Sequence, residues 1–477
     1  MKTTIGFQLE TNDPSTRPEK EAETLAKKHA SLLTLHETVA SDDAGREFLS
    51  FIREVKLNGE SVDGVKVVNA YGGVFRALAK SRRTWRTHVC DLALCGANAV
   101  AREASARGAN ARSVREKSAN ALALGSDLKT FEAISNVSET TMTAWVRACT
   151  RELSEEFLLA SAALGNDAET SAETRVAIPT PAMLGNVADV VRAPATKGER
   201  HAMREKFDKS RSWSERADDL IRFYAEHGAG VLGSHAVVAF DASSAWLART
   251  MDKDDESMYS FVELGDAWFA PVLRSQERAA ETIRANTKRH GAAVGKAQHV
   301  LVHGNEGSGK RWLLRSVLGE MIRSGETNVR VVLLSRTELR NVSQLCDRMK
   351  SEPRVRFVVL LELPLALAPH AEFYNTLTSA LDGGGTVWPS NAVMYATAPL
   401  DSCLKPESHE GGSRGLSDVF GIKIDTHTTT ESFIVDARDL ARRQGVDFAD
   451  VDALQFLGEA KPSLTLARCF IDSKTAL

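Results

Sequence analysis

The fold of this chain is decided by residues 300–314, which read VLVHGNEGSGKRWLL. The first three residues are Val, Leu and Val, and with His303 they form a short, mainly apolar run, as in a strand that is covered on both faces. From Trp312 onward the sequence has helical character. Between the two lie three glycines and Lys310. Glycines let backbone amides curve around an anion at a helix N-terminus, and the lysine reaches its outer oxygens. This order predicts a P-loop that binds the phosphates of a nucleoside triphosphate.

The phosphate-binding residues predicted from this stretch follow the Walker A pattern G-x-x-x-x-G-K and the position after it. They are Gly304, Asn305, Glu306, Gly307, Ser308, Gly309, Lys310 and Arg311. The pattern alone occurs by chance, but its place between a strand and a helix favours a phosphate site over a simple glycine-rich turn.

Arg311 departs from the pattern, which places Ser or Thr after the lysine so that a hydroxyl can bind Mg²⁺. An arginine offers no ligand to a metal, and its charge opposes a cation while favouring phosphates. We therefore predict that a nucleotide held here depends little on Mg²⁺. The alternative is that Arg311 points to solvent and a water molecule replaces the hydroxyl.

The second element of such a site is a pair of acidic residues at the end of a neighbouring strand. The candidate strand is residues 357–361. Glu362 follows and is the candidate magnesium ligand, with a solvated strand-end carboxylate as the alternative. The next position, which should orient the attacking water, is Leu363, whose side chain cannot do so. We therefore assign no catalytic residue and expect slow or absent hydrolysis.

Short apolar runs alternate with helical stretches from about residue 263 onward. The predicted strands are residues 300–303, 329–334, 357–361 and 393–397, and the predicted helices are residues 310–324, 338–350 and 373–381. Alternation of this kind predicts a mostly parallel, doubly wound α/β domain over roughly residues 260–430. Before it, the sequence is rich in Ala, Leu, Glu and Arg and predicts helices.

Bulk composition excludes few functions. The net charge of −3 over 477 residues gives no global reason to expect nucleic acid or an acidic membrane as partner. Six dispersed cysteines lack the spacing of a zinc site and suggest reduced thiols. No apolar run has the length of a signal peptide core or a membrane span, so we expect a cytoplasmic protein without membrane contact.

A local basic stretch over residues 76–117 surrounds Trp85. Clustered arginines beside an aromatic ring can contact phosphates and stack on a base, so nucleic acid is one candidate partner. A solvated helix face is the commoner explanation of such a stretch.

Residues 213–470 resemble a bacterial family of predicted AAA+ type ATPases that is catalogued as a domain of unknown function. The resemblance rests on several blocks in the family's order: FYAEHGAG at residues 223–230, Gln276 with Asn286 and Thr287, residues 377–384, NAVMYAT at residues 391–397, and LSDVFG at residues 416–421. Together these blocks are more specific than the P-loop alone.

The resemblance implies an AAA+ type fold with a five-stranded parallel sheet and a small C-terminal helical lid. It also implies ATP as the nucleotide, and assembly into homo-oligomeric rings or pairs. The chain departs from the family at functional positions: Pro399 stands at the sensor position with Thr397 nearby, Val419 replaces an arginine, and Arg468 is the best survivor of the basic residues in the lid. This set indicates a degenerate member, a pseudoenzyme.

We thus expect a helical N-terminal domain over residues 1–175, a linker and helical pre-ATPase segment over 176–260, the P-loop NTPase core over 261–430 and the helical lid over 431–477. Three functions remain open. The chain is an ATP-binding switch or regulatory subunit with weak or absent hydrolysis, an active ATPase with compensating residues, or a scaffold that binds a protein client without nucleotide.

Overall fold

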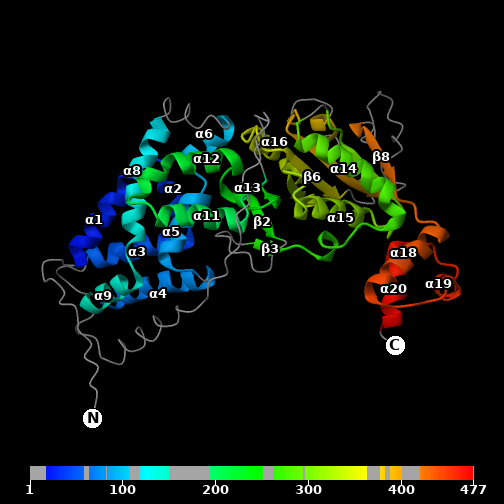
Figure 1. Ribbon diagram of the computed structural model, residues 1–477, viewed down its shortest axis with the longest axis horizontal. Coiled ribbons are helices and arrows are strands. Elements are labelled where there is room, and N and C mark those ends of the chain that lie inside the picture. The colour runs from blue at the N-terminus through cyan, green and yellow to red at the C-terminus, as the bar shows by residue number, and fades with distance from the viewer. Residues whose placement is uncertain are drawn as a thin grey trace, which may run out of the picture. The chain divides into compact units, whose positions relative to one another are not determined.

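The computed structural model describes residues 18–57, 64–81, 83–107, 119–149, 193–250, 261–293, 296–362, 377–381, 387–399 and 419–475. The chain divides into two compact units. The first comprises Met1–Val100, Arg112–Gly185 and Gly198–Ile221, and the second comprises Ala101–Ala111, Asn186–Lys197 and Arg222–Leu477. Figure 1 traces both from blue to red along the chain.

The first unit is helical where it is described. Its helices are α1 (Pro18–Ala30), α2 (His36–Ser41), α3 (Asp43–Leu57), α4 (Gly64–Ser81), α5 (Trp85–Cys95), α8 (Ala119–Ser135), α9 (Glu139–Cys149) and most of α11 (Lys197–Asp208), followed by the 3-10 helix η1 (Trp213–Arg216). Large side chains fill its interior. Phe48 packs on Trp85 with ring centroids 4.1 Å apart, and both are fully buried.

A buried carboxylate joins α5 to α11 within this unit. Asp91 is 1% exposed and forms ion pairs with Arg83, which precedes α5, and with Arg204 on α11. A buried charge is tolerated only when it is paired, so burial of the Asp91 carboxylate in this unit requires both arginines. The contact links residues 113 positions apart in the chain.

Trp85 is not placed to stack on a nucleic-acid base, which was the less favoured of the two interpretations of this stretch. The indole is 0% exposed, and its Nε1 donates a hydrogen bond to the Ile134 carbonyl (2.9 Å). The ring supplies apolar area to the core, which outweighs any surface role. Two neighbouring arginines also have acidic partners, since Arg83 pairs with Asp91 and Arg86 pairs with Asp208. Arg112 and Arg115 lie outside the described residues.

The second unit contains an eight-stranded sheet of order β3-β2-β1-β5-β6-β7-β4-β8. The strands are β1 (Val237–Asp241), β2 (Ala245–Thr250), β3 (Phe261–Glu263), β4 (Val300–Gly304), β5 (Arg330–Leu334), β6 (Phe357–Glu362), β7 (Ala392–Pro399) and β8 (Ile422–Asp425). All neighbours pair in parallel except β1 and β2. The sheet is mostly parallel and belongs to an α/β fold, as predicted.

Three of the eight strands were not predicted, so the expected count of five applies to β5-β6-β7-β4-β8 alone. The added strands β1, β2 and β3 extend the sheet beyond β5. A tight turn joins β1 to β2, in which Asp241 accepts hydrogen bonds from the backbone amides of Ser243 and Ser244. The strands β1 and β2 lie in the range 176–260 expected to hold linker and helix, and β3 begins just after it; short strands of this kind have no periodic signal of their own.

Helices cover both faces of this sheet (Figure 1). On one face, α14 (Glu277–Gly291) and α15 (Lys310–Arg323) pack on strand residues such as Val302 and Tyr395. On the other, α16 (Val342–Lys350) packs on residues such as Met394. Strands enclosed in this way must be apolar throughout, which explains the run FVVLL in β6.

A buried arginine at the start of β5 holds two short helices in place. The Arg330 side chain is 0% exposed and donates to the carbonyls of Leu232 (2.7 Å) in α13 (Gly230–Ser234) and His227 (3.2 Å), the last residue of α12 (Ala217–His227). It also donates to Asn328 (2.8 Å). The carbonyls at helix ends lack partners within the helix, and here a guanidinium satisfies them.

The C-terminal helices α18 (Thr430–Gln444), α19 (Asp450–Leu457) and α20 (Leu464–Thr475) form a small bundle with its own core, which includes Leu273. Two buried acids of α18 attach it to the segment before α14. Asp436 accepts from the Ser275 hydroxyl, and Asp439 accepts from the Arg274 backbone amide (2.8 Å). None of the helices in the described part of the chain has both the length and the hydropathy needed to cross a bilayer.

Candidate functional site

The predicted P-loop lies between β4, which ends at Gly304, and α15, which begins at Lys310. Gly307 and Gly309 adopt left-handed backbone conformations, with φ of 73° and 84°. Such angles strain residues that carry a Cβ atom. The stretch is therefore a curled loop that leads into a helix N-terminus, and it is neither extended nor helical.

The two glycines are also needed because other segments press on the loop. A Cβ atom on Gly309 would lie 2.7 Å from Leu464 Cδ2 and 2.8 Å from Gln276 Nε2. The backbone amide of Thr465 donates to the Gly307 carbonyl (3.3 Å), and Gln276 Nε2 donates to the Ser308 carbonyl (3.3 Å). The start of α20 thus rests directly on the loop.

Lys310 points back into the loop. Its Nζ donates hydrogen bonds to the carbonyls of Gly304 (2.9 Å) and Asn305 (2.6 Å). Burial, and next the nearby positive charge of Arg311, lower the pKa of Lys310 from its ordinary value. The ammonium is hydrogen-bonded to neutral oxygens and forms no ion pair with a carboxylate among the described residues, although the charge of Glu306 acts on it from a distance. An anion entering the loop would therefore not have to displace an acid from Lys310.

The remaining loop residues differ in their surroundings. Ser308 is buried and shares a hydrogen bond with Thr426 Oγ1 (2.9 Å) at the end of β8. Asn305 Nδ2 lies 2.8 Å from His427 Nδ1. Glu306 is exposed. The side chains of Asn305 and Ser308 therefore anchor the loop to the segment after β8, while its backbone provides the concave surface.

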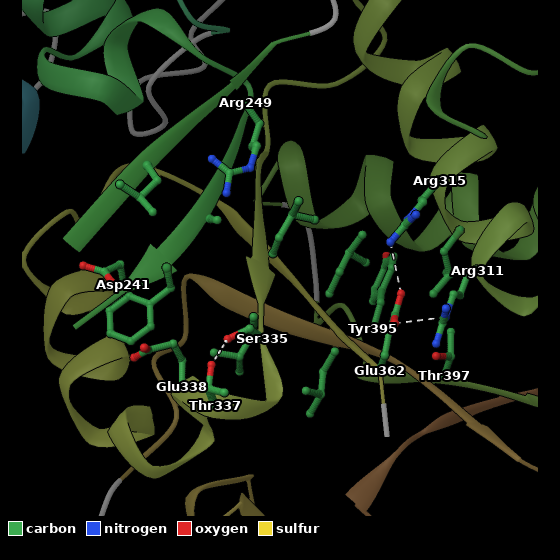
Figure 2. Close-up of a pocket in the computed structure, with 18 residues that line it drawn as sticks. Asp241, Arg249, Arg311, Arg315, Ser335, Thr337, Glu338, Glu362, Tyr395 and Thr397 are labelled. Atoms are coloured by element: carbon green, nitrogen blue, oxygen red, sulfur yellow. Dashed lines mark hydrogen bonds and ion pairs between the residues drawn. The ribbon is translucent and has the colours of Figure 1, made fainter. Parts of the chain in front are cut away.

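Glu362, the candidate metal ligand, is paired with two arginines of α15. Arg311 Nε lies 2.9 Å from its Oε2, and Arg315 Nη2 lies 3.0 Å from its Oε1. Figure 2 shows both guanidinium groups directed at this carboxylate. Each carboxylate oxygen thus has a cationic donor. Opposite Glu362 in the sheet register is Thr397, which is 5% exposed.

This donor set does not fit Mg²⁺. The ion requires oxygen ligands in octahedral geometry, and a guanidinium beside the carboxylate supplies positive charge where an oxygen is needed. In the part of the chain that the structure describes, no group of three or more His, Cys, Asp or Glu residues is arranged to hold a metal. The alternative in which Arg311 only points to solvent does not match its ion pair with Glu362.

The positions that depart from the family pattern can be placed in part. Pro399 ends β7 next to Gly304 in the register, and Val419 packs against the apolar core. Arg468 lies over the ring of Trp312, with 5.0 Å between its Cζ and the ring centroid. Leu363 lies outside the described residues.

Two features of the site were not predicted. Arg315 was not singled out, although its spacing of four residues from Arg311 places both on one face of a helix, where they can meet one carboxylate. The contact of Thr465 with the loop was also not predicted. Nothing in the local sequence of residues 463–465 indicates that they contact a loop about 150 residues earlier in the chain.

Residues 245–472 match the model of a family described as "Protein of unknown function (DUF815)". This region is similar to the DUF815 family. The match confirms the resemblance to a family catalogued as a domain of unknown function. The DUF815 region begins at the first residue of β2, contains the P-loop, and ends within α20. No curated protein matches the chain.

Solved structures similar to the chain include three kinds of protein. One is the Thermotoga maritima RuvB Holliday junction branch migration motor, with 17% identity and a TM-score of 0.28 over 41% of this chain and 60% of that chain. Another is AMPPCP-bound DnaA from Aquifex aeolicus, with 12% identity and a TM-score of 0.30 over 42% of this chain and 62% of that chain. The third is C. elegans PCH-2, with 13% identity and a TM-score of 0.27 over 45% of this chain and 61% of that chain. The chain therefore spans about 60% of the length of these structures.

Proposed function

We propose that the chain is an ATP-binding protein of AAA+ type with weak or absent hydrolysis, and that the nucleotide acts as a switch ligand. The observation that carries the proposal is the pairing of Glu362 with Arg311 and Arg315 beside a P-loop whose lysine has no acidic partner among the described residues. One half of the site suits phosphate, and the other half does not suit magnesium.

Phosphate binding is assigned to the backbone of residues 304–309, to Lys310 and to Arg311. The glycine conformations and the N-terminus of α15 support this assignment, since amides at a helix start attract anions. Lys310 would exchange its two carbonyl partners for phosphate oxygens, which form stronger, charge-assisted hydrogen bonds. A guanidinium at position 311 can add a further donor without a metal.

Weak hydrolysis follows from what surrounds the phosphates. Phosphoryl transfer relies on a metal ion between the outer phosphates and on a residue that orients water. Glu362 is neutralised by two arginines, and Thr397 is buried in the sheet. Magnesium would have to displace a guanidinium before it could bind the carboxylate.

The switch role is supported by the contact of the lid with the loop. Because Thr465 and Leu464 touch Gly307 and Gly309, phosphates entering the loop must change the position of the start of α20. Nucleotide occupancy and lid position would then be linked, so that each stabilises one arrangement of the other.

The test is titration of the full chain with a fluorescent ATP analogue, with Mg²⁺ and with EDTA, for the wild type and Lys310→Ala. Lys350→Ala, on the opposite face of the sheet, is the matched control. We expect binding that is similar with and without Mg²⁺, lost in Lys310→Ala and retained in Lys350→Ala, with no phosphate release.

Other outcomes favour the other functions. Phosphate release that disappears in Lys310→Ala would indicate an active ATPase with compensating residues. Absence of binding to both ATP and GTP analogues would indicate a scaffold or a protein that binds a client without nucleotide. Competition between unlabelled ATP and GTP in the same assay identifies the preferred base.

A further inference from the structure

A cavity of about 430 Å³ lies on the α15 face of the sheet, beside the P-loop, and Arg311 is the one residue it shares with those assigned to phosphate. Its floor follows from the strand register. Leu247 on β2 pairs with Ala239 on β1, which pairs with Leu333 on β5, then Leu360 on β6 and Tyr395 on β7. Residues that are paired across strands share one face, so these side chains form one continuous, mostly apolar row.

The walls of the cavity come from two sources. Leu314, Arg311 and Arg315 of α15 form one side. The other side is formed by the strands β1 and β2, which extend the sheet past β5. The cavity therefore lies over the part of the sheet that extends beyond the area covered by α15. Ligand sites in α/β sheets commonly lie at the carboxyl ends of the strands, where this cavity opens onto Glu362 and Ser335.

Each acid that lines the cavity already has a partner. Glu362 is paired with Arg311 and Arg315. Glu338 accepts a hydrogen bond from Asn341 Nδ2 (2.8 Å). Asp241 accepts from the hydroxyls of Ser243 and Ser244, and these bonds hold the pKa of Asp241 at about 2. Figure 2 shows Asp241 and Glu338 on the opposite side of the cavity from the Glu362 group.

Among the cations that line the cavity, Arg249 on β2 is the one that pairs with no acid among the described residues. Its Nη1 donates to the neighbouring Ala248 carbonyl (2.9 Å), and it forms no ion pair with the described residues. Burial lowers the pKa of Arg249 from its ordinary value, so its charge is partly desolvated without compensation. Figure 2 shows the guanidinium at the edge of the cavity, apart from Arg311 and Arg315. A partly desolvated guanidinium is stabilised by an anion.

The size of the cavity and its lining define what can bind. Drug-sized and metabolite-sized ligands occupy pockets of roughly 300–1,000 Å³ that are mainly apolar, with a few polar groups that set orientation. We propose that this cavity binds a small organic anion with an apolar body. The body lies on the row from Leu247 to Tyr395, and the carboxylate, sulfonate or phosphate group pairs with Arg249.

This site is separate from the P-loop and does not depend on the proposed nucleotide function. The Arg311 and Arg315 side chains border both sites, however, so an occupant of the cavity lies beside the cations that hold Glu362. The cavity is therefore placed to act on the P-loop without overlapping the phosphate-binding backbone.

The test uses two fluorescent probes on the full chain without nucleotide. Anilinonaphthalene sulfonate is a small apolar anion, and phenylnaphthylamine has the same ring framework without the sulfonate. In the wild type we expect both to bind, the anion more tightly. Arg249→Gln should weaken the anion by roughly tenfold or more, as expected for loss of a charge-assisted hydrogen bond, and should leave the neutral probe unchanged.

Two further variants locate the site. Arg340→Gln removes an exposed arginine that does not line the cavity, and it should bind both probes like the wild type. Ala239→Phe fills the floor of the cavity with a residue that suits a strand, and it should abolish binding of both probes while the thermal unfolding midpoint stays near that of the wild type.

The proposal is overturned if Arg249→Gln binds the sulfonate as the wild type does, or weakens both probes equally. It is also overturned if a folded Ala239→Phe retains the wild-type affinities, since the probes would then occupy another place. A wild-type chain that binds neither probe would equally refute a site for small apolar anions.

Discussion

Replacing Arg311 by threonine should make nucleotide binding dependent on magnesium. The substitution removes the guanidinium 2.9 Å from Glu362 and places a hydroxyl at the position that normally supplies a metal ligand. Arg315 continues to pair with the other carboxylate oxygen, so Glu362 keeps one cationic partner and gains one free oxygen.

The size of the effect follows from the geometry. A magnesium ion about 2 Å from the Glu362 oxygen would lie roughly 4 Å from the Arg311 guanidinium. Two unit charges at about 4 Å repel by about 1 kcal/mol in water, and by about 4 kcal/mol in a partly screened site. Because the Arg311 side chain is 60% exposed, the aqueous limit applies. A divalent ion doubles it to about 2 kcal/mol, which corresponds to roughly thirtyfold in affinity.

The assay compares the affinity for a fluorescent ATP analogue with Mg²⁺ and with EDTA. We expect a ratio near one for the wild type and a ratio roughly thirtyfold larger for Arg311→Thr. Arg278→Thr, an exposed arginine on α14, serves as the control and should behave like the wild type. A folded Arg311→Thr chain that remains indifferent to Mg²⁺ would refute the reasoning, as would a wild type that already requires the ion.

Three other predictions concern stability. Gly309→Ala should lower the free energy of unfolding in urea by roughly 1–3 kcal/mol, because the new Cβ atom both requires an unfavourable φ and clashes with Leu464. The control Gly325→Ala, at φ 70° with nothing within 4 Å, has the backbone cost alone, and equal losses in the two variants would refute the clash. Burial raises the pKa of Asp436 to about 6, so its contribution to stability should be complete below about pH 4 and decrease by up to about 3 kcal/mol as pH rises through 6. In a pH series of thermal melts, this part of the pH dependence should be absent in Asp436→Asn. Arg330→Met should cost roughly 3–5 kcal/mol, because two buried carbonyls and one half-buried carbonyl lose this donor. A loss under about 1 kcal/mol in denaturant titration would contradict the assigned role.

The sequence was sufficient for the central part of the fold. Residues 300–314 predicted the strand, loop and helix, because glycines with left-handed φ next to a lysine leave few alternatives. The apolar run of β6 was also predicted, since strands covered on both faces contain no polar interruptions. The strands β1 and β2 were not predicted. The row AWLART of β2 mixes apolar and polar residues over six positions, and only its neighbours in the sheet make it a strand.

The loop between a strand and a helix was predicted because its signal is local in sequence, whereas contacts that depend on the tertiary fold were not. The effect of Arg311 on a metal stays a prediction from its charge. The ion pair of Arg311 with Glu362 was not predicted, because Glu362 lies 51 residues further along the chain and meets Arg311 only through the sheet. The role of Trp85 was left open because a tryptophan in a basic stretch can be either a surface ring or a core residue, and its burial is decided by packing on Phe48.

The buried Asp91 has a practical consequence for how the protein can be divided. Its partner Arg204 belongs to α11, which follows residues 151–192 in the chain, so the first unit includes residues on both sides of that segment. A fragment that stops near residue 175 would leave Asp91 enclosed with one arginine and would expose the apolar surface that Phe207 and Trp213 cover. During synthesis this unit can therefore finish folding only after residue 221 has left the ribosome, and expression of the N-terminal part alone should extend at least that far.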